Sequence, residues 1–367
     1  MRHIALAPLG AWGLAVALAA TGVAAEPPDT PAWNARAAAT YLDGEMEWWS
    51  TWPNAARDHG TFCVSCHTVA PYVLARPALA AALKETELTP PARKLFDNVA
   101  TRVRLWNEVA PYYPDQRSGL PKTSESRGTE SVLNALVLST RDSHTRTLSA
   151  ETTQAFDHMW ALQMRTGPLD GAWAWLNFHY EPWESDGAPY FGAAMAVAAL
   201  ANAPGGYAES AEAKAGVDRL RKYISSGFDA QNLFNQLTMS VAARRFGGVV
   251  TPAQRQAAAT AVASLQQEDG GWSLSRFGTF ARVDKTPLDT ASDGYATALA
   301  VLAMQQGGSQ TLQPALTRGL AWLQSHQDAN GRWVATSLNK QRDPGSDPAR
   351  FMNDAATAYA VIALTAR

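Results

Sequence analysis

Two kinds of helical segment alternate along this chain. Leu312, Leu316 and Leu323 place apolar side chains on one face of a helix, whereas residues 296–304 and 355–364 are apolar all round. The first pattern is typical of an outer helix with one solvated face, and the second of a helix buried on every side. The pattern therefore predicts an all-α protein in which outer and inner helices alternate.

Counting these segments along the chain gives six pairs of an outer and an inner helix. The predicted pairs are 31–52 with 66–84, 89–106 with 127–141, 149–165 with 187–203, 209–224 with 229–246, 252–267 with 290–306, and 311–326 with 352–366. Apolar runs of about a dozen residues are too short to span a bilayer. Six pairs are enough to close a ring, so we expect a single (α/α)6 toroid domain over residues 26–367.

Internal repeats support the pairing. Trp272 and Trp333 are 61 residues apart, and so are Asp293 and Asp354. Two landmarks that keep one period indicate a repeated structural unit. A third copy lies upstream, within residues 170–203.

The same repeats carry a family resemblance. The stretch from Gln267 to Trp272 recurs from Gln327 to Trp333. These residues resemble the glutamine-to-tryptophan motif of the terpene cyclase and prenyltransferase toroids, such as the squalene-hopene cyclases. The clear match covers residues 150–367, and the first two pairs are an extrapolation.

The chemistry of those relatives is not expected here. Their cyclases use an Asp-X-Asp-Asp motif to protonate an alkene, and the nearest stretch, residues 289–293, departs from it. Their prenyltransferases need a zinc-bound cysteine, and we assign both cysteines of this chain to another role. The resemblance therefore implies the fold and not the reaction.

The N-terminus reads as an export signal. Arg2 precedes a mostly apolar run over residues 4–20, and residues 21–25 are mostly small. This order is typical of a signal peptide cleaved near Ala25, although an uncleaved membrane anchor is the alternative. We expect a periplasmic protein without a membrane span in the mature chain.

The charge balance narrows the partners. Removal of residues 1–25 leaves 30 basic and 33 acidic side chains, a formal charge of −3. A balance of this kind argues against nucleic acid as a partner. A periplasmic redox protein or a small-molecule substrate remains.

Both cysteines fall in one motif, Cys63-Val64-Ser65-Cys66-His67. This spacing is that of c-type haem attachment, with His67 as the proximal iron ligand. The chain thus resembles a c-type cytochrome with one covalent haem c. The alternative is a disulfide, which an exported protein with two cysteines would ordinarily form.

The long links between helices are predicted to gather at one end of the ring. In pairs two, three, five and six, the link from outer to inner helix has about 20 residues or more by the helix spans above. The Cys63–His67 motif occupies the equivalent link of pair one. We therefore expect the motif to lie at the same mouth as the long links.

Several side chains are candidates for the far side of the iron. His179 is the first choice and the only candidate catalytic residue, because it lies in the long link of pair three and outside the repeats. The candidates for a sixth iron ligand are His179, Met352, His326 and His59.

The link of pair three also supplies candidate pocket residues. Trp175, Tyr180 and Trp183 do not recur in the other repeats, so they are candidates for lining a pocket, although packing is the simpler interpretation. Asp186 and Asp293 precede inner helices, where a carboxylate caps the first turn. The alternative is that these acids bind a cation or orient a polar substrate.

Three functions remain open. An electron-transfer cytochrome is the first hypothesis. A haem-dependent oxidoreductase with its substrate at the mouth is the second, and a haem-based binding or sensing module is the third.

Overall fold

The computed structural model describes Met1 and residues 33–366 of the 367-residue chain. Apart from Met1, the predicted signal peptide lies outside the described residues. The helices are α1 (Ala35–Thr51), α2 (Val69–Leu83), α3 (Pro90–Arg104), α4 (Asp115–Ser118), α5 (Lys122–Thr145), α6 (Ala150–Leu162), α7 (Ala188–Asn202), α8 (Ala211–Gly227), α9 (Leu233–Ala242), α10 (Pro252–Ala263), α11 (Gly294–Gly307), α12 (Gln313–Ser325) and α13 (Asp347–Thr365). Within the described part of the chain there is no strand, only three isolated bridges.

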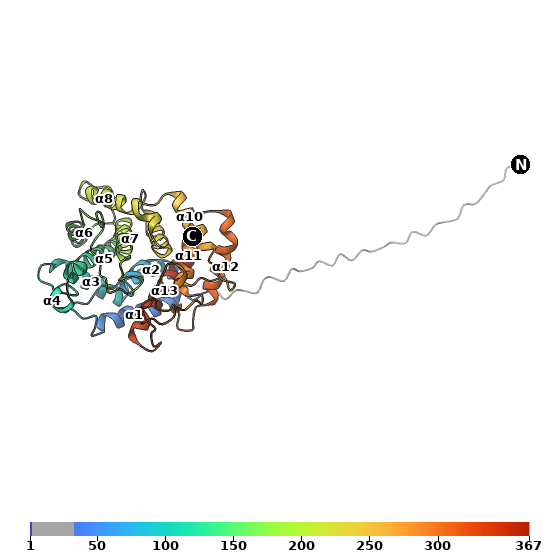
Figure 1. Cartoon of the computed structure of the whole chain (residues 1–367), viewed down its shortest axis with the longest axis horizontal. Helices are drawn as coiled ribbons and strands as arrows, with labels where there is room; N and C mark the ends of the chain where they lie inside the picture. The colour runs from blue at the N-terminus through green and yellow to red at the C-terminus, as the bar shows by residue number, and fades with distance from the viewer. Residues whose placement is uncertain (2–32, 367) are drawn as a thin grey trace.

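The helices form a closed double ring. The inner ring runs α2, α5, α7, α9, α11 and α13, each packed against the next, and α13 packs against α2 to close it. The outer helices α1, α3, α6, α8, α10 and α12 pack against the outside of this ring. Figure 1 shows α2, α7, α11 and α13 near the middle and α8, α10 and α12 at the rim. The predicted (α/α)6 toroid of six helix pairs is confirmed.

A glycine after an outer helix contacts the next outer helix in three of the pairs, and the last of these contacts closes the outer ring. Gly270 turns the chain after α10 at φ 91°, and a Cβ there would lie 3.1 Å from the carbonyl oxygen of Arg318 in α12. Gly331 turns it after α12 at φ 89°, and a Cβ there would lie 2.3 Å from the backbone of Ala37 in α1. Only glycine fits both the positive φ and the close approach. Gly171 makes the same contact with α8.

A glutamine reinforces each of these turns. Gln266 donates to the backbone of its own turn and to the carbonyl of Ala315 in α12, at 2.9 Å. Gln327 donates to its own turn and to the carbonyl of Asn34 before α1, at 3.1 Å. The sequence motif aligned Gln267 with Gln327, but the Gln267 side chain bonds the loop before α11. Gln266 is the structural equivalent, since it lies one full period before Gln327.

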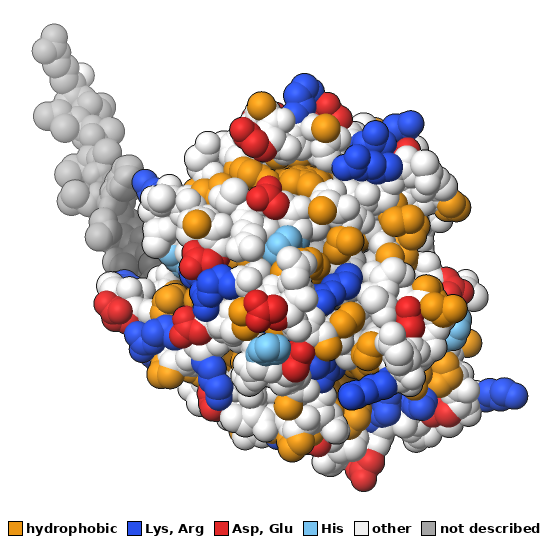
Figure 2. Space-filling model, turned by 90° about the vertical axis from the view of Figure 1, so that its left-hand side faces the viewer, with side chains coloured by type: hydrophobic (Ala, Val, Ile, Leu, Met, Phe, Trp, Pro, Cys, Tyr) orange, Lys and Arg blue, Asp and Glu red, His pale blue; other side chains and the backbone are white. Residues whose placement is uncertain are grey.

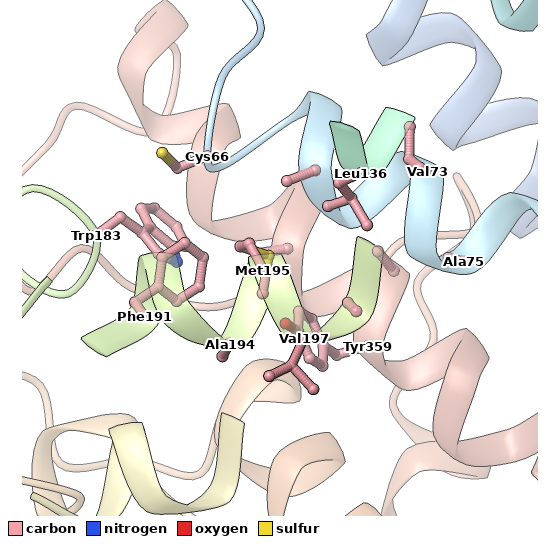
Figure 3. Close-up of a cluster of buried hydrophobic side chains, with 14 of the residues drawn as sticks. Cys66, Val73, Ala75, Leu136, Trp183, Phe191, Ala194, Met195, Val197 and Tyr359 are labelled. Atoms are coloured by element: carbon pink, nitrogen blue, oxygen red, sulfur yellow. The ribbon is translucent and has the colours of Figure 1, made fainter. Parts of the chain in front are cut away.

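The centre of the ring is filled with side chains. Figure 3 shows Met195 in the middle of this cluster, with Trp183 and Phe191 together on one side, Tyr359 on the other and Cys66 at the edge. The inner helices are rich in alanine, and their centres are almost entirely buried. The small side chains let these helices approach closely, so any site must lie at an end of the ring and not along its axis.

The surface carries mixed charge. Figure 2 shows Lys and Arg side chains interspersed with Asp and Glu over the visible face. Among the described residues, no helix is both long enough and apolar enough to cross a membrane.

Candidate active site

A cavity of about 230 Å³ lies at the mouth where the long links meet. Its wall comes from the end of α1, the links of pairs one, two, three and six, and the start of α13. The residues that line it include Trp49, Trp52, Asn54, Arg57, Cys63, Cys66, His67, Tyr113, Thr129, Tyr180, Trp183, Glu184, Ser337, Asn339, Arg342, Phe351 and Met352. The prediction that the Cys63–His67 motif sits at the mouth with the long links agrees with this geometry.

The backbone of the motif is held from all sides. The Trp49 indole donates to the Cys63 carbonyl at 2.7 Å, and the Val64 amide donates to the Tyr112 hydroxyl at 3.2 Å. The Ser65 hydroxyl accepts from two amides at the beginning of α2, each at 3.2 Å. Ser65 therefore caps the helix that leaves the motif, and the motif forms a rigid wall.

The two cysteines are buried and free. Burial raises the pKa of Cys63 to about 11 and raises the pKa of Cys66 as well. Both side chains are therefore protonated thiols at neutral pH, which are poor nucleophiles.

The His67 ring is fixed by its neighbours. It stacks on Phe351 at 3.7 Å between centroids and meets Trp49 edge-on at 4.9 Å. Its Nδ1 lies 3.0 Å from the Thr68 hydroxyl. Burial lowers the pKa of His67 to about 3, so the ring is neutral at physiological pH.

Glu184 brings a carboxyl group to the same cavity. Its amide and carbonyl pair with Tyr180 at 2.9 and 2.8 Å, which closes a tight loop and aims the side chain at the mouth. Burial raises the pKa of Glu184 to about 7, and Lys122 opposes this rise only in part. Glu184 therefore holds a proton that it can donate near neutral pH.

Two arginines of the cavity have only neutral partners among the described residues. Arg57 donates to the carbonyls of Asn54 and Ala56, at 3.0 and 2.8 Å. Arg342 donates to the Asn339 side chain at 2.9 Å. With Glu184 protonated, the cavity carries a positive charge that favours an anionic ligand.

Some predicted site residues line the cavity. They are Cys63, Cys66, His67, Tyr180, Trp183 and Met352. Trp175, by contrast, is buried outside it, where its ring fills the space over Gly192 and its indole donates to the Trp183 carbonyl at 3.0 Å. Trp175 thus supports the loop instead of contacting a ligand.

The histidine candidates other than His67 lie away from the cavity lining. His179 is exposed and lies 3.7 Å from Asp186, which is also exposed. His326 stacks on Trp322 at the surface, and His59 occupies an exposed turn at φ 53°. The link of pair three turns its tip outward, because the pairing of Tyr180 with Glu184 directs Glu184 inward instead.

The two repeated aspartates have different surroundings. Asp293 caps α11 by accepting from the Ala296 amide at 2.9 Å, as expected from its position. Asp354 lies inside α13 and accepts from the hydroxyls of Tyr41 and Thr68, at 2.9 and 2.6 Å. Asp186 caps no helix, since Gly187 precedes α7 and makes no side-chain cap.

Three side chains that line the cavity were not predicted from the sequence. Glu184, Phe351 and Arg57 line the cavity without any motif of their own. Glu184 stood in the aromatic link of pair three among several acids, and no pattern separated it from Glu181 or Asp186.

The comparisons with known proteins bear mainly on the fold. A family model described as the squalene-hopene cyclase C-terminal domain matches residues 237–354. None of the curated proteins matches this chain. A solved structure of a glycosidase variant is 12% identical over 90% of this chain and 96% of its own, with a TM-score of 0.50.

Two further solved structures are similar. Another glycosidase variant is 13% identical over 90% of this chain and 96% of its own, with a TM-score of 0.49. A structure described as UGL with dGlcA-Glc-Rha-Glc is 10% identical over 90% of this chain and 95% of its own, also at 0.49. The family model and the structure with a TM-score of 0.50 support the toroid.

The predicted periplasmic monohaem cytochrome with an electron-transfer role is contradicted. The solved structure that matches at a TM-score of 0.50 is a glycosidase variant and not a cytochrome. In the described part of the chain no three His, Cys, Asp or Glu residues gather as a metal site. The Cys63–His67 motif is present in the sequence, but its histidine stacks on Phe351 and bonds Thr68. The assignment of haem c, iron and electron transfer is therefore withdrawn.

Proposed function

We propose that this protein is a carbohydrate-active enzyme that binds a saccharide in the mouth cavity and protonates its glycosidic oxygen from Glu184. One observation carries the proposal: a carboxyl group whose pKa burial raises to about 7 lines a cavity walled by aromatic rings. A protonated carboxyl near the operating pH is the group that general acid catalysis of glycoside cleavage uses.

The walls suit a sugar ring. Trp49, Trp52, Trp183 and Phe351 surround the cavity with flat apolar surfaces, and the rings of Trp49 and Trp52 lie 5.5 Å apart. A pyranose has apolar faces that pack on such rings, while its edge carries hydroxyl groups. Binding pockets commonly combine aromatic walls with a few polar groups that fix orientation.

The polar groups favour an acidic saccharide. Asn54, Asn339 and Ser337 offer amide and hydroxyl groups to sugar hydroxyls. Arg57 and Arg342 have donors on a cationic group that no described carboxylate neutralises. A guanidinium binds a carboxylate through paired hydrogen bonds, so a uronic acid unit fits this cavity better than a neutral sugar.

The mechanism uses a single carboxyl group. Among the described residues that line the cavity, Glu184 is the one carboxylic acid. The double displacement of retaining glycosidases needs a second carboxylate as nucleophile. We therefore assign Glu184 the role of proton donor to the leaving glycosidic oxygen as the bond from that oxygen to the anomeric carbon breaks. A water molecule, held by a non-carboxylate acceptor, adds to the anomeric carbon, and the proton that it loses restores the acid form of Glu184.

The test compares two glutamates of one loop. A uronic-acid-terminated disaccharide and its neutral glucose counterpart are incubated with the full chain, and release of the reducing sugar is measured against pH. Glu184→Gln is expected to lower kcat by about 10²–10⁴-fold, the usual contribution of a general acid. Glu181→Gln is the control, because Glu181 bonds Ser185 and does not line the cavity.

The pH dependence of activity has an expected direction. Activity needs the protonated form of Glu184, so it falls as pH rises through the Glu184 pKa of about 7. Failure to cleave or bind either disaccharide overturns the proposal, and so does full activity of Glu184→Gln. Binding without cleavage also overturns the enzyme assignment. We also propose export, predicted from residues 1–25, which suits an enzyme that meets its glycan outside the cytoplasm.

A further inference from the structure

A chain of hydrogen bonds crosses the seam where the last helix pair meets the first. The Tyr41 hydroxyl of α1 donates to Asp354 Oδ1 at 2.9 Å, and the Thr68 hydroxyl donates to Asp354 Oδ2 at 2.6 Å. The same Thr68 oxygen lies 3.0 Å from His67 Nδ1. Asp354 thus acts on the histidine of the cavity through one hydroxyl group.

The hydrogen bonds that link His67, Thr68 and Asp354 have a defined donor and acceptor at each step. A threonine hydroxyl has one hydrogen, and here that hydrogen goes to Asp354 Oδ2. Burial raises the pKa of Asp354 well above its ordinary range, so this carboxyl carries a proton, which we place on Oδ1 so that Oδ2 accepts from Thr68. The Thr68 oxygen can then only accept from His67, so Nδ1 carries the ring proton. In a neutral imidazole the other nitrogen, Nε2, is then an acceptor with a free lone pair.

The free nitrogen is accessible. No described residue bonds Nε2, and Nε2 is not one of the buried atoms without a partner, whereas Nδ1 lies against Thr68 at the beginning of α2. Because His67 lines the cavity, a ligand there can reach Nε2. Phe351 stacks on the ring at an interplanar angle of 18° and Trp49 meets it at 84°, so these contacts and the Thr68 hydroxyl hold the ring in place.

We propose that His67 binds the saccharide by accepting a hydrogen bond from a sugar hydroxyl at Nε2, and that Asp354 is a positioning residue that acts through Thr68. This assignment rests on the proposed function, because it takes the mouth cavity as the saccharide site. It deepens that function by requiring a substrate hydroxyl within reach of His67 in the cavity that Glu184 also lines.

The relay is tested first without any ligand. Long-range proton–nitrogen NMR on the full chain reports which ring nitrogen of His67 is protonated, with His67→Gln to assign the signals. We expect the Nδ1-protonated form in the native protein and in Thr68→Ser, and a mixture of both forms in Thr68→Val. Thr129→Val is the matched control, because Thr129 also lines the cavity but accepts from the Leu176 amide. An Nε2-protonated native ring overturns the inference whatever the protein binds.

The second step adds the uronic-acid-terminated disaccharide. Saturating disaccharide is expected to shift the Nε2 signal, and Thr68→Val is expected to raise KM by about two- to tenfold with a smaller change in kcat, as for the loss of one hydrogen bond. Thr68→Ser should restore KM. If the disaccharide binds and is cleaved while the Nε2 signal stays in place, this inference fails and the proposed function stands. If the disaccharide does not bind, the proposed function fails, and the role of His67 in binding falls with it.

Discussion

The fifth and sixth helix pairs are close copies in sequence, yet only the sixth reaches the cavity. Both turn on a glycine, Gly270 or Gly331, and both bury a tryptophan, Trp272 or Trp333, completely. The indole of each tryptophan donates to the outer helix of its pair, at 2.7 and 2.8 Å. The packing of the repeat is therefore the same in both copies.

The repeated aspartates show where the copies part. Asp293 precedes α11 and caps it, whereas Asp354 lies inside α13, because α13 begins as early as Asp347. An aspartate inside a helix has no first-turn amides to accept from, so its carboxyl is available to other donors. In pair six those donors are hydroxyl groups of pair one. The same residue type at the same repeat position caps a helix in one copy and connects to the site in the other.

The difference teaches that position in the ring decides the role. Pair five is followed by pair six, whose link is another copy of the repeat. Pair six is followed by pair one, whose link carries the Cys63–His67 motif. A repeat acquires a function here because of what it meets at the seam.

The largest expected loss of stability comes from a substitution at the seam between pairs six and one. Gly331→Ala places a Cβ 2.3 Å from the Ala37 backbone at a strained φ, whereas Gly270→Ala meets α12 at 3.1 Å. Gly331→Ala should lower the free energy of unfolding by about 5 kcal/mol and Gly270→Ala by about 2–3 kcal/mol. Urea unfolding followed by circular dichroism measures both. Equal losses would show that the closer backbone approach at Gly331 than at Gly270 has no effect on stability.

An intermediate effect separates the two aspartates. Asp293→Ala removes a helix cap and should cost about 2 kcal/mol. Asp354→Ala leaves two buried hydroxyls without their acceptor and should cost about 3 kcal/mol. Only Asp354→Ala should also change the protonated nitrogen of His67 in NMR spectra. A change at His67 in Asp293→Ala of similar size would remove the distinction between the two pairs.

The smallest effect concerns the glutamines of the turns. Gln266→Ala and Gln327→Ala each remove a bridge to the next outer helix, and each should cost about 1 kcal/mol. Gln267→Ala, which bonds only a loop, is the control and should cost less. Thermal unfolding of the three variants side by side measures the difference. A larger loss of stability in Gln267→Ala than in Gln266→Ala would make Gln267, and not Gln266, the equivalent of Gln327.

The fold was predictable to within a few residues at most helix ends. The predicted inner helix 66–84 corresponds to α2, and the predicted outer helix 252–267 contains α10. Periodicity worked because each helix has a fixed side toward the core. The beginnings of α5 and α13 were placed too late, since their first turns are polar and lie at the rim, where no apolar stripe marks them.

The site was predictable only in part. The Cys63–His67 motif was expected at the mouth, and Tyr180 and Trp183 were candidates for lining a pocket there, with packing as the simpler interpretation; all of them line the cavity. The candidate His179 is exposed, and the pairing of Tyr180 with Glu184 next to it has no sequence signature. The chemical meaning of the motif was also misjudged, since five residues carried the cofactor assignment alone.

By itself the sequence determined the class of fold, the number of helix pairs and the end of the ring where the long links gather. Periodic burial and a constant repeat length depend on the order of residues along the chain, so they can be recognised from the sequence alone. Only the tertiary structure decided that Glu184 faces inward and that Asp354 reaches His67 through Thr68. The Thr68–Asp354 contact joins residues from opposite ends of the chain, and it exists only once the last helix packs against the first. Glu184 is directed by its local pairing with Tyr180, which has no sequence signature.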